Sequence, residues 1–161
     1  MIKKFNLLFI TFFKIGEIKY VPGTIASLVT CLLFLLFLNF LNIVILFFFT
    51  LLITFYSFVA INYSLDSFDS NDPREIVIDE VVGQMLPLLA IPIYETLYLA
   101  PKEYYCIMAF VLFRLFDIWK PFPINYIDKN IEGSLGVILD DILAGIYTIV
   151  ILIMIFFFIG A

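Results

Sequence analysis

Histidine is absent from this sequence, and lysine and arginine are few and do not form runs. The absence of histidine excludes catalysis by an imidazole acid or base, and it excludes metal sites with imidazole ligands. The absence of basic runs argues against a nucleic-acid partner. The two cysteines, Cys31 and Cys106, lie in separate apolar segments without metal-site spacing, and we expect no disulfide between them.

Apolar residues dominate what is present. The 161 residues are 64% hydrophobic and include 20 phenylalanines, and the mean hydropathy is +1.13. A soluble domain of this size cannot bury so much apolar surface, since globular chains are roughly 45–50% apolar. We therefore predict one integral-membrane domain over residues 1–161, of the all-α class and built as a multi-pass membrane helical bundle.

The first two membrane helices are expected to form a hairpin. Pro22 suits the first position of a helix, where its missing N–H loses no hydrogen bond. A nearly charge-free run follows at 25–40, about 24 Å long at the helical rise, and a second run of about 28 Å occupies 43–61. The sequence Asn-Phe-Leu-Asn at 39–42 predicts a tight turn between them.

Three further helices are expected after the hairpin. They are placed at 81–94, 101–119 and 137–159. A polar loop at 64–75 precedes the first of them, which carries two prolines and either crosses the membrane or re-enters it. The stretch 120–134 is expected to be a loop with a short surface helix. The N-terminal run 5–13 is expected to lie in the membrane interface. The prediction is therefore about five membrane helices plus an N-terminal interfacial helix.

The distribution of charge predicts an orientation in the membrane. If the N-terminus is cytoplasmic, five crossings place every lysine and arginine except Lys102 on the cytoplasmic side, as the positive-inside rule requires. The same topology places every acid except Glu95 and Glu103 on that side. Because acids have little effect on orientation, this second observation locates the polar chemistry at the cytoplasmic surface of the membrane.

Five acids lie where predicted helices meet that surface. Asp79 and Glu80 are expected to open one helix, Asp140 and Asp141 to lie in the first turns of another, and Asp117 to lie near the end of a third. The helix dipole stabilises an acid in a first turn by about 0.3–1 kcal/mol, which would explain the two pairs without any function. However, five acids brought together repel one another unless a cation lies among them. Ligands that are all oxygen atoms suit Mg²⁺, or else Mn²⁺ or Ca²⁺.

Two basic side chains and one helix start indicate an anionic ligand such as phosphate. Arg114 lies one turn before an acid, and Lys120 lies directly before a proline. The alternatives are a local ion pair for the arginine and an interfacial lysine. In the stretch Pro-Gly-Thr-Ile-Ala-Ser, Gly23 allows backbone N–H groups close to a ligand, and Thr24 and Ser27 add hydroxyl groups. The alternative for this stretch is simple helix capping.

Two glycines indicate how the helices that carry the acid pairs pack. Gly83 lies four residues after Asp79, and Gly145 lies four residues after Asp141. Small residues at these positions predict close helix packing one turn deeper than the acids.

Four motifs, taken in order, resemble those of the bacterial phosphatidylglycerophosphatase A family. They are PGT at 22–24, IDEVVG at 78–83, FRLFDIWKPFPI at 113–124 and GVILDDILAG at 136–145. The resemblance covers about residues 16–145. It implies a multihelical, Mg²⁺-dependent membrane phosphatase that hydrolyses the terminal phosphate monoester of a membrane phospholipid, phosphatidylglycerophosphate, to give phosphatidylglycerol. The implied location is the bacterial cytoplasmic (inner) membrane, with the N-terminus and the active site on the cytoplasmic side.

The resemblance and the charge pattern together assign roles to individual residues. The expected catalytic residues are Asp79, Glu80, Asp117 and Asp141. The expected Mg²⁺ ligands are these four residues and Asp140. The expected phosphate-binding residues are Thr24, Ser27, Arg114 and Lys120. A metal-polarised water would attack phosphorus, and Asp79 is the candidate for a base that acts instead of a metal ligand; the sequence does not divide these two roles among the acids. Two positions depart from the family pattern, which more often has glycine at Ala26 and a bulky apolar residue at Gln84.

Other classes of function compete with this interpretation. Intramembrane acids often mark the pathway of an ion transporter or channel, but here the positions in the middle of the predicted spans are almost entirely apolar. A lipid phosphotransferase would carry the signature Asp-Gly-x-x-Ala-Arg, which is absent. A cysteine-dependent phosphatase would need Cys-x5-Arg, which is also absent. A purely structural bundle leaves the five acids unexplained.

Overall fold

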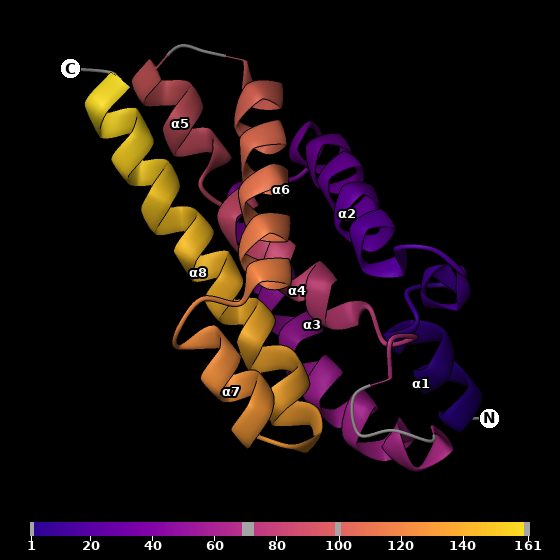
Figure 1. The fold of residues 1–161 in the computed structure, drawn as a ribbon. Helices are drawn as coiled ribbons and strands as arrows, with labels where there is room; N and C mark the ends of the chain where they lie inside the picture. Colours follow the sequence, from indigo (N-terminus) through magenta and orange to yellow (C-terminus); the bar gives the residue numbers. More distant parts are fainter. Residues whose placement is uncertain (1, 69–72, 99–100, 160–161) are drawn as a thin grey trace.

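The computed structural model describes residues 2–68, 73–98 and 101–159 (Figure 1). The described residues form α-helices and two short 3-10 helices and contain no strand, which confirms the all-α class. The α-helices are α1 (Ile2–Ile10), α2 (Pro22–Leu38), α3 (Ile43–Ser64), α4 (Ile78–Leu88), α5 (Ile91–Tyr98), α6 (Lys102–Trp119), α7 (Ile124–Asn130) and α8 (Gly133–Ile159). The 3-10 helices are η1 (Ile15–Glu17) and η2 (Leu65–Ser67). The predicted polar loop at 64–75 falls partly on residues outside the described ranges.

Three segments are long and apolar enough to cross a membrane. They are Ile43–Ser64, Ile78–Tyr98 and Gly133–Phe158. The segment Pro22–Leu38 is also apolar but shorter. These lengths and compositions support a membrane protein. The expected count of five membrane helices and the interfacial position of the N-terminal helix stay predictions.

The two predicted helices form, with the turn between them, but the prediction that they pack on each other as a hairpin was wrong. The side chain of Asn42 caps α3 by accepting a hydrogen bond from the backbone N–H of Val44 at 2.9 Å. The main packing partners of the two helices are nevertheless different. α2 packs on α4 and α6, whereas α3 packs on α1 and α8. A cavity lined by α1, α2, α3 and α4 lies between them.

The segment that was predicted as one apolar helix at 81–94 is two helices. α4 begins earlier, at Ile78, and contains Pro87, and α5 follows after a turn at Leu89 and Ala90. Pro92 explains the interruption, because its ring would clash with the carbonyl group four residues earlier in a continuous helix. At the second position of α5 the same proline is well tolerated.

α4 lies in the middle of the bundle and contacts α2, α3, α6 and α8 (Figure 1). A Cβ added at Gly83 would lie 2.6 Å from the carbonyl oxygen of Asp141, and one added at Gly145 would lie 2.5 Å from the carbonyl oxygen of Gly83. Both glycines are therefore required for the close approach of α4 and α8, which confirms the predicted packing.

The last helix begins earlier than predicted. α8 starts at Gly133, and the prediction placed the start near Val137. Asp140 and Asp141 therefore lie about two turns inside the helix, at 3.6 residues per turn, and their expected place in its first turns was wrong. The helix dipole acts mainly within the first turn, so it does not account for this pair.

Candidate active site

The start of α4 is held in place by a neighbouring helix. The backbone N–H of Val77 donates to the carbonyl oxygen of Ile10, where α1 ends, at 3.0 Å. Asp79 and Glu80 occupy the first turn of α4, as predicted. α8 packs alongside and brings Asp141 to the same place. One carboxylate oxygen from each of these three acids lies within 4.8 Å of the others.

This three-carboxylate cluster, Asp79, Glu80 and Asp141, has the properties of a site for a hard divalent cation. Asp79 is 8% exposed and Asp141 is 3% exposed. Two buried oxygens, Oε2 of Glu80 and Oδ1 of Asp141, accept no hydrogen bond from the described residues. Buried carboxylates this close repel one another and lack their hydration. Oxygen donors alone are the ligands that Mg²⁺ prefers, so the residues present fit that ion.

Arg114 joins the cluster to a fourth acid. Its Nη1 lies 2.6 Å from Oδ2 of Asp117 and 3.8 Å from Oε1 of Glu80, and all three side chains are largely buried. The ion pair that the i,i+3 spacing predicted is therefore present. The Nε donor of Arg114 is buried without a hydrogen-bond acceptor among the described residues. A planar guanidinium beside the cluster is suited to hold a phosphate oxygen.

The Pro-Gly-Thr helix start also lies at the cluster. A Cβ added at Gly23 would lie 1.8 Å from Oε1 of Glu80, so the group close to this glycine is the Glu80 carboxylate. Thr24 is half-buried in the same turn. Ser27 is fully buried, and its hydroxyl donates to the carbonyl oxygen of Gly23 at 2.9 Å. The hydroxyl proton of Ser27 is thus already used within the helix. Phosphate binding by Thr24 and Ser27 stays a prediction.

Lys120 lies between two carboxylates on other helices. Its Nζ donates to Oδ2 of Asp140 at 2.7 Å and to Oδ1 of Asp128 on α7. Partial burial opposes the charge of Lys120, but these two hydrogen bonds outweigh it and raise the pKa of the ammonium group above its ordinary value. Asp140 is further fixed because it accepts the backbone N–H of Asp141 at 3.0 Å.

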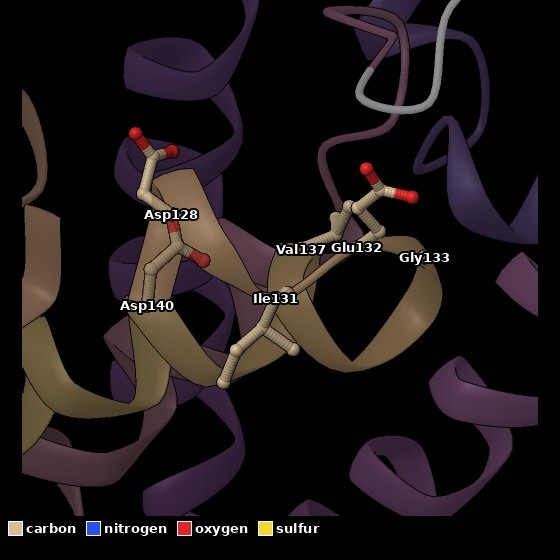
Figure 2. Close-up of a pocket in the computed structure, with 7 residues that line it drawn as sticks. Asp128, Ile131, Glu132, Gly133, Val137 and Asp140 are labelled. Carbon is tan, nitrogen blue, oxygen red and sulfur yellow. The ribbon is translucent and has the colours of Figure 1, made fainter. Parts of the chain in front are cut away.

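Asp128 is the residue at this site that the sequence analysis missed. It lies on α7, whose presence confirms the short helix predicted in the 120–134 stretch. It lines a cavity of about 80 Å³ with Glu132 and Asp140, as Figure 2 shows. The sequence did contain a signal for this residue. Pro121 and Pro123, which follow Lys120, favour a turn, and a turn at this place brings α7 back to that lysine.

The five predicted acids therefore have three kinds of surroundings. Asp79, Glu80 and Asp141 share the cluster, Asp117 pairs with Arg114, and Asp140 pairs with a lysine. The five acids come from three helices, α4, α6 and α8, which meet beside the start of α4. An arrangement of carboxylates with an arginine and a lysine at its edge can hold a cation and an anionic oxygen group together.

The comparisons with known proteins identify the family. The family profile described as phosphatidylglycerophosphatase A matches residues 8–156. The chain belongs to the phosphatidylglycerophosphatase A family. The resemblance carried by the four motifs is thereby confirmed, and the matched region contains every candidate residue of the site. No solved structure matches this chain.

Two of the three relatives described here match over most of the length of this family member. A Haemophilus influenzae protein named phosphatidylglycerophosphatase A is 34% identical over 86% of this chain and 81% of its own. An Escherichia coli protein of the same name is 38% identical over 47% of this chain and 40% of its own. A Bacteroides thetaiotaomicron protein, provisionally named a phosphatidylinositol-3-phosphatase, is 35% identical over 88% of this chain and 87% of its own. All three names describe phosphatases of phospholipid head groups.

Proposed function

We propose that the protein hydrolyses the terminal phosphate monoester of phosphatidylglycerophosphate, with water, to phosphatidylglycerol and inorganic phosphate. Family membership supports this reaction. The observation that carries it is the buried cluster of Asp79, Glu80 and Asp141 beside Arg114. We place the site at the cytoplasmic surface of the bacterial inner membrane, in line with the distribution of basic residues.

In this proposal the three-carboxylate cluster holds Mg²⁺. When bound, the ion would neutralise charge on the phosphoryl oxygens and lower the pKa of a bound water. Asp117 and Asp140 were also expected to be ligands. Their ion pairs with Arg114 and Lys120 support a different assignment, in which they orient these two cations.

The remaining residues would act on the phosphate group and on the attacking water. Arg114 would donate hydrogen bonds to a phosphate oxygen, and its buried Nε offers a donor without an acceptor among the described residues. Lys120, with a raised pKa, would supply a second positive charge. Thr24 would donate from the first turn of α2. One carboxylate of the cluster, with Asp79 as the candidate, would accept the proton of the attacking water as general base instead of binding the ion.

The experiment that tests the function is phosphate release from phosphatidylglycerophosphate by protein purified in detergent, with Mg²⁺ and with excess chelator. We expect release with Mg²⁺ and none with chelator. Asp79→Asn and Asp141→Asn should abolish release, and full activity in either variant would remove that residue from the mechanism. Absence of release by folded wild-type protein in both conditions would overturn the proposal.

Phosphatidylinositol 3-phosphate is a second candidate substrate. It is considered because one relative, identical at 35% of positions over most of the chain, is provisionally named for that activity. The same assay, with equal mole fractions of the two lipids in the micelle, compares them directly. A larger kcat/KM for the inositol lipid would replace phosphatidylglycerophosphate as the substrate and leave the assignment of the carboxylates unchanged.

A further inference from the structure

A large apolar cavity, called the acyl groove below, lies beside the candidate active site. It has a volume of about 630 Å³, is lined by α1, the turn after it, α2, α3 and α4, and is partly open to the surface of the molecule. This is within the range of roughly 300–1,000 Å³ that small-molecule sites occupy. The wall is formed mainly by phenylalanine, leucine and isoleucine side chains, such as those of Phe9, Leu33, Phe34 and Ile53. The groove is therefore large enough for a substantial ligand.

The acyl groove offers nothing to a polar ligand. Thr30 and Tyr56 are the polar side chains in its described lining, and both hydroxyls are already used. The hydroxyl of Thr30 donates to the carbonyl oxygen of Ala26 at 2.8 Å, and that of Tyr56 donates to Oδ1 of Asn6 at 2.7 Å. Because water in a cavity needs several polar partners, this lining suits an apolar occupant.

The acyl groove and the three-carboxylate cluster share α4, and α2 borders both of them. Ile78 and Val81 line the groove and lie directly before and after Asp79 and Glu80 in the first turn of α4. On α2, the backbone of Gly23 lies against Glu80, and residues from the following turns, Thr30 onward, line the groove. The groove therefore continues from the helix starts that form the site, along helices with the composition of membrane spans.

We propose that the acyl groove binds one acyl chain of the phospholipid whose phosphate group is held at the cluster. This inference rests on the proposed function, which gives the substrate acyl chains. A chain of methylene groups matches a wall that has apolar side chains and no free hydrogen-bonding group, and each methylene buried there adds to affinity. The edge-to-face contact of Phe9 with Tyr56, with ring centroids 4.8 Å apart, fixes α1 on α3 and holds that wall in place.

The first test fills the acyl groove from α2. Leu33→Trp adds bulk to a residue that lines the groove. The matched control is Leu32→Trp, at the preceding residue, whose side chain is 60% exposed and lies outside the lining. With long-chain phosphatidylglycerophosphate, Leu33→Trp should raise KM about tenfold, which corresponds to about 1.4 kcal/mol. Its kcat/KM for the dihexanoyl form should stay that of wild type, and Leu32→Trp should resemble wild type with both lipids. Equal effects of the two variants would overturn the proposal.

Ile53→Trp repeats the test from α3, at a lining residue that is partly buried, so that misfolding of one variant does not decide the outcome. A binding measurement separates the groove from the reaction. Phosphatidylglycerophosphate with a diazirine in one acyl chain is photolysed on wild-type protein in chelator, and the labelled residues are mapped by mass spectrometry. We expect labels in the groove that excess unlabelled lipid competes away. A diazirine phosphatidylcholine that labels the groove equally well would show bulk lipid there and overturn the proposal. If unlabelled lipid competes the labels away but the protein releases no phosphate, the groove proposal is supported and only the proposed function is overturned.

Discussion

Asp140 and Asp141 are adjacent in sequence but have different surroundings. Because successive residues of a helix point about 100° apart, Asp141 faces the cluster on α4, whereas Asp140 faces Lys120. Asp141 is buried with one oxygen that accepts no hydrogen bond from the described residues. Asp140 has a cationic partner. The difference predicts that removing the negative charge of Asp141 stabilises the metal-free fold, whereas removing that of Asp140 destabilises it.

Asp141→Asn should raise the melting temperature of the metal-free protein, because it relieves repulsion among three buried carboxylates. It should also abolish the stabilisation by Mg²⁺, which for wild type is about 2.7 kcal/mol at an ion concentration 100 times Kd. Differential scanning fluorimetry with a Mg²⁺ titration measures both. Glu17→Gln, an exposed acid on η1, is the control. A normal Mg²⁺ shift in Asp141→Asn would exclude this residue as a ligand.

Gly23→Ala should displace the Glu80 carboxylate, because the added Cβ would lie 1.8 Å from its Oε1. We expect Mg²⁺ affinity to fall about 10–100-fold, the range seen when a group that orients a metal ligand is lost. Isothermal titration with Mg²⁺ measures the change. Leu28→Ala, on the exposed side of the same helix, should bind as wild type does. Unchanged affinity in the glycine variant would mean that Glu80 is not a ligand.

Asp128→Asn tests the pair formed with Lys120. The raised pKa means that the folded state binds the Lys120 proton more tightly than the unfolded state, for which the pKa is about 10.4. The stabilisation is therefore complete below about pH 10 and is lost as pH rises through the folded-state pKa. We expect Asp128→Asn to cost about 1–2 kcal/mol, equally at pH 7 and pH 9. Urea unfolding at both pH values measures it, with Asp66→Asn as control. A cost that disappears at pH 9 would contradict the assignment.

At the scale of elements, the position of α4 against α8 determines whether the acids meet. Asp79 and Asp141 come from different helices, and Gly83 and Gly145 lie where those helices touch. The backbone groups opposite each glycine cannot move without separating the two helices. The distance between the acids therefore depends on these two residues.

Gly83→Ala should destabilise the fold by about 1–3 kcal/mol, the usual cost of overpacking. It should also weaken Mg²⁺ binding, because moving α4 away from α8 separates Asp79 from Asp141. Urea unfolding and Mg²⁺ titration measure the two effects. Ser134→Ala, a half-buried position in the first turn of α8, is the control. Lower stability with unchanged Mg²⁺ binding would show that the acids do not depend on this contact.

At the scale of the whole molecule, the orientation in the membrane is the open prediction. Lys102 and Glu103 start α6, and α7 lies at the opposite end of that helix (Figure 1). A cysteine at Glu103 should react with a membrane-impermeant maleimide from outside intact cells. A cysteine at Glu132 should react only after the cells are lysed. The native thiols are buried, so wild-type protein is the blank. The opposite labelling pattern would reverse the orientation.

The amino-acid sequence by itself determined the all-α membrane class, the place of the acid pair in the first turn of α4, and the family. These depend on local properties: apolar composition, proline positions and the order of short motifs. It also indicated the close contact of two helices, because glycine at both positions has a direct steric meaning. The start of α8 was misjudged, since Gly133 and Ser134 resemble a loop in the sequence, whereas in the fold they begin a helix that packs on α7.

Only the tertiary structure decided how the acids divide among their partners. Sequence spacing relates residues within one helix, but the cluster joins α4 with α8, and the pair of Lys120 with Asp128 joins α6 with α7. The acyl groove has the same origin. It exists because α2 and α3, which are adjacent in sequence, pack on different partners. Helix packing in a membrane depends on shape complementarity between elements distant in sequence, and the hydrophobic pattern of each element alone does not specify it.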